Sequence, residues 1–329
     1  MIESLLGLTS LLAIVAVFGL VIGALVAALG ARFLLSDSFS DQTPPALRCR
    51  RAERIALLPV VAAMLAMLAL GLPALFKLAG LIDDHCLAHG LHHPHFCLRH
   101  LPAFDAGPLV MVLLAAGALS MAGPVRVALA QFRQTRLTAS IGHIAPADRR
   151  LIRTDSELPR AFLFGIRKPR IILTQGLLQK LTSAERRAVV RHEIAHARAG
   201  DLARRLMLTL LASVHLPQTR QRLLRHWNQA AEERADDRVA SRGQGLDLAS
   251  ALVKILRDQV PGSSAQAHSM GADSADVARR IRRLADRPGE SRIARWPERS
   301  LIAGFGMMAL AAASQHHAVE TMLGWLVHG

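Results

Sequence analysis

Two histidines and a glutamate have the spacing of a helical metal-binding motif in the stretch His192-Glu193-Ile194-Ala195-His196. Residues four apart lie on one face of a helix, with Cβ atoms about 5–6 Å apart. Two imidazoles in this arrangement can bind one zinc ion at about 2.0–2.1 Å. Glu193 lies one step around the helix, where it can accept a proton from an attacking water molecule. The pattern therefore predicts zinc-dependent hydrolysis with one zinc ion per chain, the alternative being a chance match on an exposed helix.

A catalytic zinc site needs a third protein ligand, and the sequence excludes one source of it. The extended motif of the metzincins would need glycine at position 199 and histidine at position 202. The chain has Ala199 and Leu202 at these positions. The third ligand is therefore expected on a later element.

The segment 232–236, with the sequence EERAD, offers a carboxylate ligand. Glu232 and Asp236 are four apart on one helix face, so Glu232 can bind zinc while Asp236 supports a histidine ligand from behind. Glu233 is adjacent, so a shift of one residue in the third ligand stays open. The alternative is that the acidic segment only pairs with the arginines around it.

The elements that would position these residues can be predicted from local signals. Thr182 and Glu185 match a capping box and Gly200 matches a C-cap, so 181–200 is expected to be a helix. Further helices are expected at 202–216, 219–241, 246–259 and 275–285, and short strands at 150–154, 161–165 and 170–174. The apolar part of 202–216 is too short to cross a bilayer, so it is either core or lies against the membrane. Residues 261–274 are rich in Gly, Ser and Ala and are expected to form a linker.

The bulk composition indicates a membrane portion joined to a basic soluble portion. The 329 residues are 51% hydrophobic and carry a formal net charge of +15. Four apolar runs are long enough to cross a bilayer of about 30 Å, at about 5–31, 55–76, 106–125 and within 300–329. Tyr is absent and aromatic residues are few, so no direct nucleic-acid binding is expected. The first three spans have no charge and no histidine, which disfavours a transporter.

The loop charges predict the orientation of the chain. Arginine is frequent in 32–54 and 126–299, whereas the loop 77–105 has only Lys77 and Arg99 as basic residues. With positive charge kept inside, both termini face out and the domain 126–299 is cytoplasmic. The expectation is a multi-pass protein of the bacterial inner membrane, with three spans in 1–125 and a fourth span and outer tail in 300–329.

The loop 77–105 has two unusual features. Cys86 and Cys97 both lie in it, where an outer location would permit a disulfide, although two cysteines in one loop can also be coincidence. Six histidines also crowd this loop, which is consistent with an outer metal or pH sensor, or with a solvated loop that holds no fixed site. These histidines are His85, His89, His92, His93, His95 and His100.

The order of the motifs resembles that of the BlaR/MecR-type antirepressor membrane metallopeptidases. FLFG at 162–165, KPRIIL at 168–173, GLL at 176–178 and RHEIAHARAGD at 191–201 are followed by EERAD and by RIRRL at 280–284. The resemblance covers nearly the whole chain and is most specific in 160–240. It implies a gluzincin fold with zinc ligands His192, His196 and Glu232 and catalytic Glu193. The related Ste24/HtpX-type membrane proteases share these motifs.

The resemblance implies a mainly α membrane protein with four transmembrane helices and an α+β metallopeptidase domain that has a small sheet. The expected function is cleavage of a cytoplasmic or membrane-proximal protein, with a transcriptional repressor as one substrate class. His226 and nearby arginines are candidates for stabilising the oxyanion. Sensors of this family carry a penicillin-binding domain after the fourth span, which this sequence does not contain, so direct β-lactam sensing is not expected. The alternatives are a quality-control protease of the HtpX/Ste24 type and an inactive receptor that uses its zinc domain to bind a partner.

Overall fold

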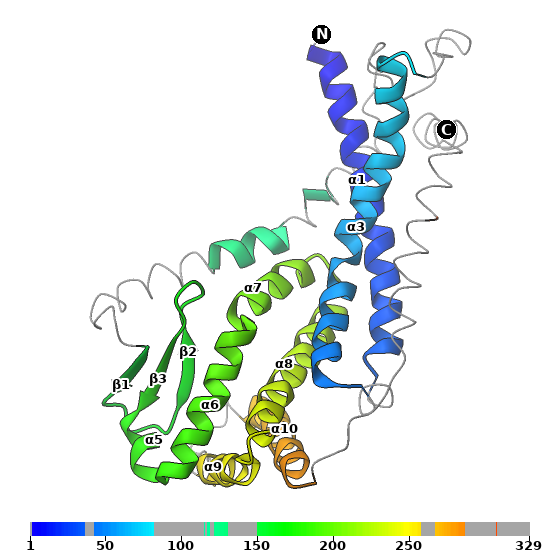
Figure 1. The fold of residues 1–329 in the computed structure, drawn as a ribbon. Helices are drawn as coiled ribbons and strands as arrows, with labels where there is room; N and C mark the ends of the chain where they lie inside the picture. Colours follow the sequence, from blue (N-terminus) through cyan, green and yellow to red (C-terminus); the bar gives the residue numbers. More distant parts are fainter. Residues whose placement is uncertain are drawn as a thin grey trace.

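Two long apolar helices dominate one end of the structure. The computed structural model describes residues 2–36, 43–81, 115, 117–118, 122–130, 150–257, 267–286 and 307. Helices α1 (Ile2–Leu34) and α3 (Pro45–Leu78) run antiparallel and extend away from the other elements (Figure 1). By length and composition, both could cross a membrane. They contain the first two predicted spans, while the third and fourth fall mostly outside the described residues.

Helices α1 and α3 approach each other closely at two glycines one turn apart. A Cβ atom on Gly19 would lie 2.6 Å from Cα of Ala63, and one on Gly23 would lie 2.5 Å from Cα of Pro59. Any side chain at these positions would therefore force the helices apart. Small residues spaced by four are the usual solution for tight packing of helices in membranes.

Helix α3 begins earlier than the sequence indicates. The second span is predicted at about 55–76, yet α3 already begins at Pro45, where proline is favoured in the first helical turn. Arg48 and Glu53 of this first part form ion pairs with Glu233 and Arg204. The arginine-rich segment between the first two predicted spans is thus partly helical, and some of its charges have partners far along the chain.

A three-stranded sheet forms the opposite end of the structure. The strands are β1 (Leu151–Thr154), β2 (Ala161–Phe164) and β3 (Arg170–Thr174). The sheet order is β1-β3-β2, with β3 parallel to β1 and antiparallel to β2. The predicted strands are thus confirmed, and β2 is an edge strand.

Helices connect the sheet to the long α1–α3 pair. They are α5 (Gln175–Lys180), α6 (Ser183–Ala199), α7 (Asp201–Ala212), α8 (Pro217–Ala240), α9 (Gly245–Arg257) and α10 (Ala267–Asp286). The capping box of Thr182 and Glu185 is present, and Gly200 ends α6 with φ +68°. Helix α10 begins within the predicted linker, eight residues earlier than expected. Ala267, Met270 and Ala272 are good helix formers, and they offset the unfavourable Gly271 in this stretch.

Two clusters of buried apolar side chains hold these elements together. One joins α5, α6, α9 and α10 to the sheet, and Leu177, Val189 and Leu248 belong to it. The other joins α1 and α3 to α7 and α8, with Leu208 and Trp227 at its centre. Leu208 and Ala212 place one face of α7 in this shared core, while Met207 on another face is exposed. The helix that carries Glu232 is therefore packed directly on the two long helices.

Candidate metal centre

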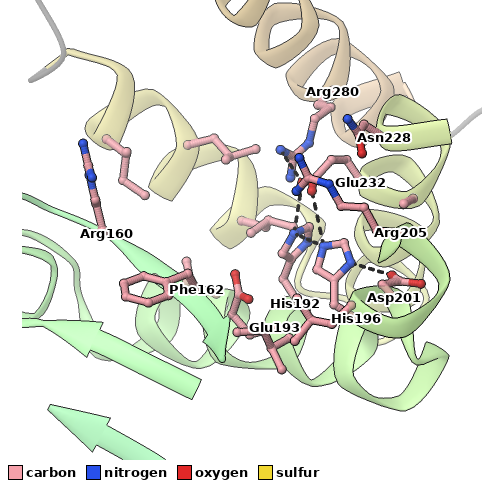
Figure 2. Close-up of a pocket in the computed structure, with 18 of the residues that line it drawn as sticks. Arg160, Phe162, His192, Glu193, His196, Asp201, Arg205, Asn228, Glu232 and Arg280 are labelled. Atoms are coloured by element: carbon pink, nitrogen blue, oxygen red, sulfur yellow. Dashed lines mark hydrogen bonds and ion pairs between the residues drawn. The ribbon is translucent and has the colours of Figure 1, made fainter. Parts of the chain in front are cut away.

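His192, His196 and Glu232 meet at one point between α6 and α8 (Figure 2). The two Nε2 atoms are 3.1 Å apart. Glu232 Oε2 is 3.4 Å from Nε2 of His192, and its Oε1 is 3.5 Å from Nε2 of His196. The predicted ligand atoms therefore converge from two helices that are separated in sequence by α7.

The distances between these atoms fit a tetrahedral zinc site. Ligand atoms about 2.0–2.1 Å from a common centre in tetrahedral geometry are separated by about 3.3 Å. The observed separations of 3.1, 3.4 and 3.5 Å lie around this value. Two imidazoles and one carboxylate also form the ligand set of a zinc peptidase site that keeps its fourth position open.

A carboxylate stands behind each histidine. Asp236 Oδ1 is 3.0 Å from Nδ1 of His192, as the sequence predicts. Nδ1 of His196 is 2.7 Å from Oδ2 of Asp201, a residue that the sequence reasoning missed. With the proton on Nδ1, each imidazole turns the lone pair of its Nε2 toward the shared point. The sequence feature that could have identified Asp201 is its position directly after the C-cap Gly200, where the chain turns back beside His196.

Oppositely charged neighbours offset the effect of burial on the pKa values of His192 and Glu232. Burial alone would lower the pKa of His192, but contacts with Asp236 and Glu232 raise the pKa to about 10. Burial would likewise raise the pKa of Glu232, yet His192 and Arg280 hold that pKa below its usual range. Arg280 on α10 donates to both Glu232 and Asp236. The carboxylates of Glu232 and Asp236 are therefore ionised, and binding of a divalent cation would displace a proton from the imidazole of His192.

Glu193 occupies the position expected of a general base. Figure 2 shows its carboxylate between the histidine pair and Phe162 of β2, and it lines the same cavity as the three ligands. Burial is the main cause that raises the pKa of Glu193, although His192 and His196 oppose it. No ion pair of the described residues occupies this carboxylate, so it is available to a water molecule in the cavity.

The cavity beside the metal ligands is large enough for a peptide. Its volume is about 690 Å³, and edge strand β2 forms one wall through Ala161, Phe162 and Leu163. Val189, Leu248, Leu252 and Ile255 give it an apolar side, while Arg160, Arg205, Asn228 and Arg280 supply hydrogen-bond donors. This combination of an apolar lining with a few polar groups is typical of substrate sites.

Glu233 points away from this cavity. Its carboxylate is buried and pairs with Arg48 of α3 and Arg279 of α10. The structure thus brings Glu232, and not Glu233, to the two histidines, which favours Glu232 as the third ligand.

His226, considered for the oxyanion, does not line the cavity. Its side chain is buried on α8. Burial first, and then the charges of Arg48, Arg51 and Arg279, lower the pKa of His226 to about 3. It is therefore a neutral core residue in this structure.

We expect Asp201→Asn to weaken zinc binding by about 10- to 100-fold, because the support of a metal-binding histidine contributes this much to affinity. Burial raises the pKa of Asp201, but hydrogen bonds with His196 and Arg234 outweigh burial, so Asp201 is a carboxylate that Asn cannot fully replace. Zinc affinity would be measured by competition with a chelator, with circular dichroism to verify folding. Asp155→Asn, an exposed change in the β1–β2 connection, is the control. Equal affinity of both variants would contradict the role of Asp201.

Several sequence predictions fall on residues that are not described. The histidines at 85, 89, 92, 93, 95 and 100, and both Cys86 and Cys97, belong to this group. Their proposed sensor site and disulfide stay predictions.

In the comparison with protein-family models, residues 135–235 match peptidase family M48. This range includes β1 to β3, the two histidines, Glu193 and Glu232. The match covers less than half of the chain, in the part that holds the candidate metal centre, and peptidases of this family are zinc-dependent. Comparison with curated proteins gives no match, and comparison with solved structures gives none either.

Proposed function

We propose that this chain is a zinc-dependent endopeptidase embedded in a membrane, which cleaves a cytoplasmic or membrane-proximal protein. The observation that carries the proposal is the convergence of His192, His196 and Glu232 beside Glu193 in a cavity walled by an edge strand. A catalytically inactive receptor would have no need of a carboxylate at position 193. The apolar helices α1 and α3 support placement in a membrane.

Edge strand β2 is suited to hold an extended substrate. Because β3 occupies the centre of the sheet, only one side of β2 is paired within this sheet, and the other side borders the cavity. A substrate segment can add along β2 by main-chain hydrogen bonds, with alternate side chains in the apolar part of the cavity. The expected substrate is therefore an unfolded or extended segment of a protein.

The residues of the centre divide the work of hydrolysis. A bound zinc ion would polarise the scissile carbonyl and lower the pKa of the attacking water to about 7. Glu193 accepts the proton of that water and passes it to the leaving amine. Arg205 and Asn228 line the cavity and can donate hydrogen bonds to the developing oxyanion. Asp201 and Asp236 keep the two imidazoles oriented.

Removal of the metal should abolish activity reversibly. The full chain, purified in detergent, would be assayed with an unfolded protein substrate before and after treatment with a zinc chelator. We expect loss of cleavage on chelation and recovery on addition of zinc, but no recovery with magnesium, which prefers oxygen ligands. Full cleavage by a preparation that elemental analysis shows to be free of metal would contradict the proposal.

Identification of the biological substrate would distinguish an antirepressor role from a quality-control role, both of which fit this chemistry. Proteomes of cells that carry the native chain or its Glu193→Gln form would be compared. Accumulation of one transcriptional repressor in the variant would support an antirepressor role in signalling. Accumulation of many damaged membrane proteins would support quality control of the HtpX/Ste24 type.

A further inference from the structure

A second cavity lies on a different face of α6 from the metal ligands. It has a volume of about 740 Å³ and lies between β1, the β2–β3 turn and the α6 residues Val190, Ile194, Ala197 and Arg198. The α6 residues of the candidate metal centre are His192 and His196, and neither lines this cavity. This cavity is therefore separate from the proposed active site, and the function proposed above does not use it.

The lining of this cavity is strongly basic. Five cationic side chains contribute to it, and none of its described lining residues is acidic; the cations are Arg150, Arg167, Lys168, Arg170 and Arg198. Four of them, all but Arg170, have no ion pair within the described part of the chain, and all four are exposed. Cations gathered without counter-charges repel one another, so an anionic partner would stabilise this surface.

An exposed apolar side chain stands at the tip of the basic turn. Ile166 is 44% exposed and is followed directly by Arg167 and Lys168. Gly165 has φ +88°, and a Cβ atom there would lie 2.8 Å from the carbonyl oxygen of Lys168, so the turn is tight. An apolar tip next to cations is typical of segments that enter the headgroup region of a membrane.

The turn also lies at the end of the sheet toward which α1 and α3 extend (Figure 1). Arg150 belongs to this end, because its carbonyl oxygen accepts a hydrogen bond from the N–H of Ile171, the second residue of β3. If α1 and α3 cross a bilayer, this end of the sheet is the end that lies nearer to it. The helices then hold the basic surface close to the lipids, which favours even a weak contact.

We propose that the β2–β3 turn and the cations around it dock on anionic lipid headgroups of the membrane that α1 and α3 span. Ile166 enters the boundary of the acyl chains, and Arg167, Lys168, Arg150 and Arg198 contact lipid phosphates. A lipid partner is favoured over an acidic protein because the exposed Ile166 and the direction of the turn both suit a bilayer. Docking fixes the angle between edge strand β2 and the membrane, so it selects substrate segments close to the bilayer.

The test uses the full chain in lipid nanodiscs, with a photoreactive residue, p-benzoylphenylalanine, in place of Ile166. The discs contain phosphatidylcholine alone or with phosphatidylglycerol, and mass spectrometry identifies the adducts. We expect phosphatidylglycerol adducts in the anionic discs. Because each cation near an anionic surface contributes substantially to binding, Arg167→Glu with Lys168→Glu should lower the yield by about tenfold or more.

Arg187→Glu with Arg257→Glu is the matched control, since both residues are exposed cations outside the basic cavity. This control should keep the adduct yield of the native sequence. The proposal would be overturned by absence of lipid adducts in anionic discs, by equal yields in both charge-reversed pairs, or by polyglutamate adducts that replace the lipid adducts when polyglutamate is added. The last outcome would identify an acidic polypeptide as the partner.

The docking proposal rests on the membrane placement in the proposed function and not on its zinc chemistry. Stable incorporation of the chain into the discs tests the membrane placement by itself. Cleavage assays on the same preparations, with native Glu193, test the chemistry. Loss of adducts with normal cleavage would therefore overturn docking alone, and adducts without cleavage would overturn the peptidase alone.

Discussion

Glu193→Gln is expected to bind zinc as well as the native chain and to lose peptide cleavage by about 10²- to 10⁴-fold, the usual contribution of a general acid–base group. Glutamine has the shape of glutamate but cannot accept and return the proton of water. The metal should stay bound, because His192, His196 and Glu232 supply the ligands and Glu193 is on the cavity side. The loss should therefore affect kcat/KM without affecting metal content.

The purified variant would be assayed for zinc by elemental analysis and for cleavage of an unfolded protein. Glu157→Gln, an exposed change outside the cavity, is the control and should retain activity. Normal cleavage by Glu193→Gln would show that another group activates the water. Loss of zinc together with cleavage would instead show that the change has disturbed the metal site.

The centre of the site was predictable because its signals are local. The capping box of Thr182 and Glu185 defines where α6 begins, so the spacing of His192 and His196 places both on one face. To predict Glu232 as a neighbour of the histidines, one further assumption was needed, namely that a second helix packs against the first. The four-residue spacing to Asp236 supported that assumption, since the two carboxylates then face different ring nitrogens of His192.

The supports of the site were not predictable from the same signals. Glu53 of α3 accepts hydrogen bonds from Arg204 and from Trp227, which are 151 and 174 residues away in the sequence. Arg204 in turn is close to Asp201, which holds His196. Such pairs arise only after α3 packs on α7 and α8.

A second large effect is expected from substitutions of the adjacent residues Glu232 and Glu233, which point in different directions from α8. Glu232→Gln should lower zinc affinity severely, because it removes the anionic ligand that completes the set with His192 and His196. Glu233→Gln should keep zinc and destabilise the fold. It leaves Arg48 of α3 as a buried charge without its carboxylate partner, a change that typically costs about 3–5 kcal/mol.

The two variants are controls for each other, since both remove one negative charge from neighbouring positions. Zinc affinity would be measured by competition with a chelator, and stability by thermal unfolding of the metal-free chains in detergent. In metal-free chains Glu232 is half-buried and lies at the cavity, so its loss should lower the unfolding temperature less than loss of Glu233. The reverse pattern, with zinc lost from Glu233→Gln and retained by Glu232→Gln, would move the third ligand by one residue. It would also require α8 to turn by about 100° from the orientation in which Glu233 meets Arg48, because successive helical residues differ by that angle.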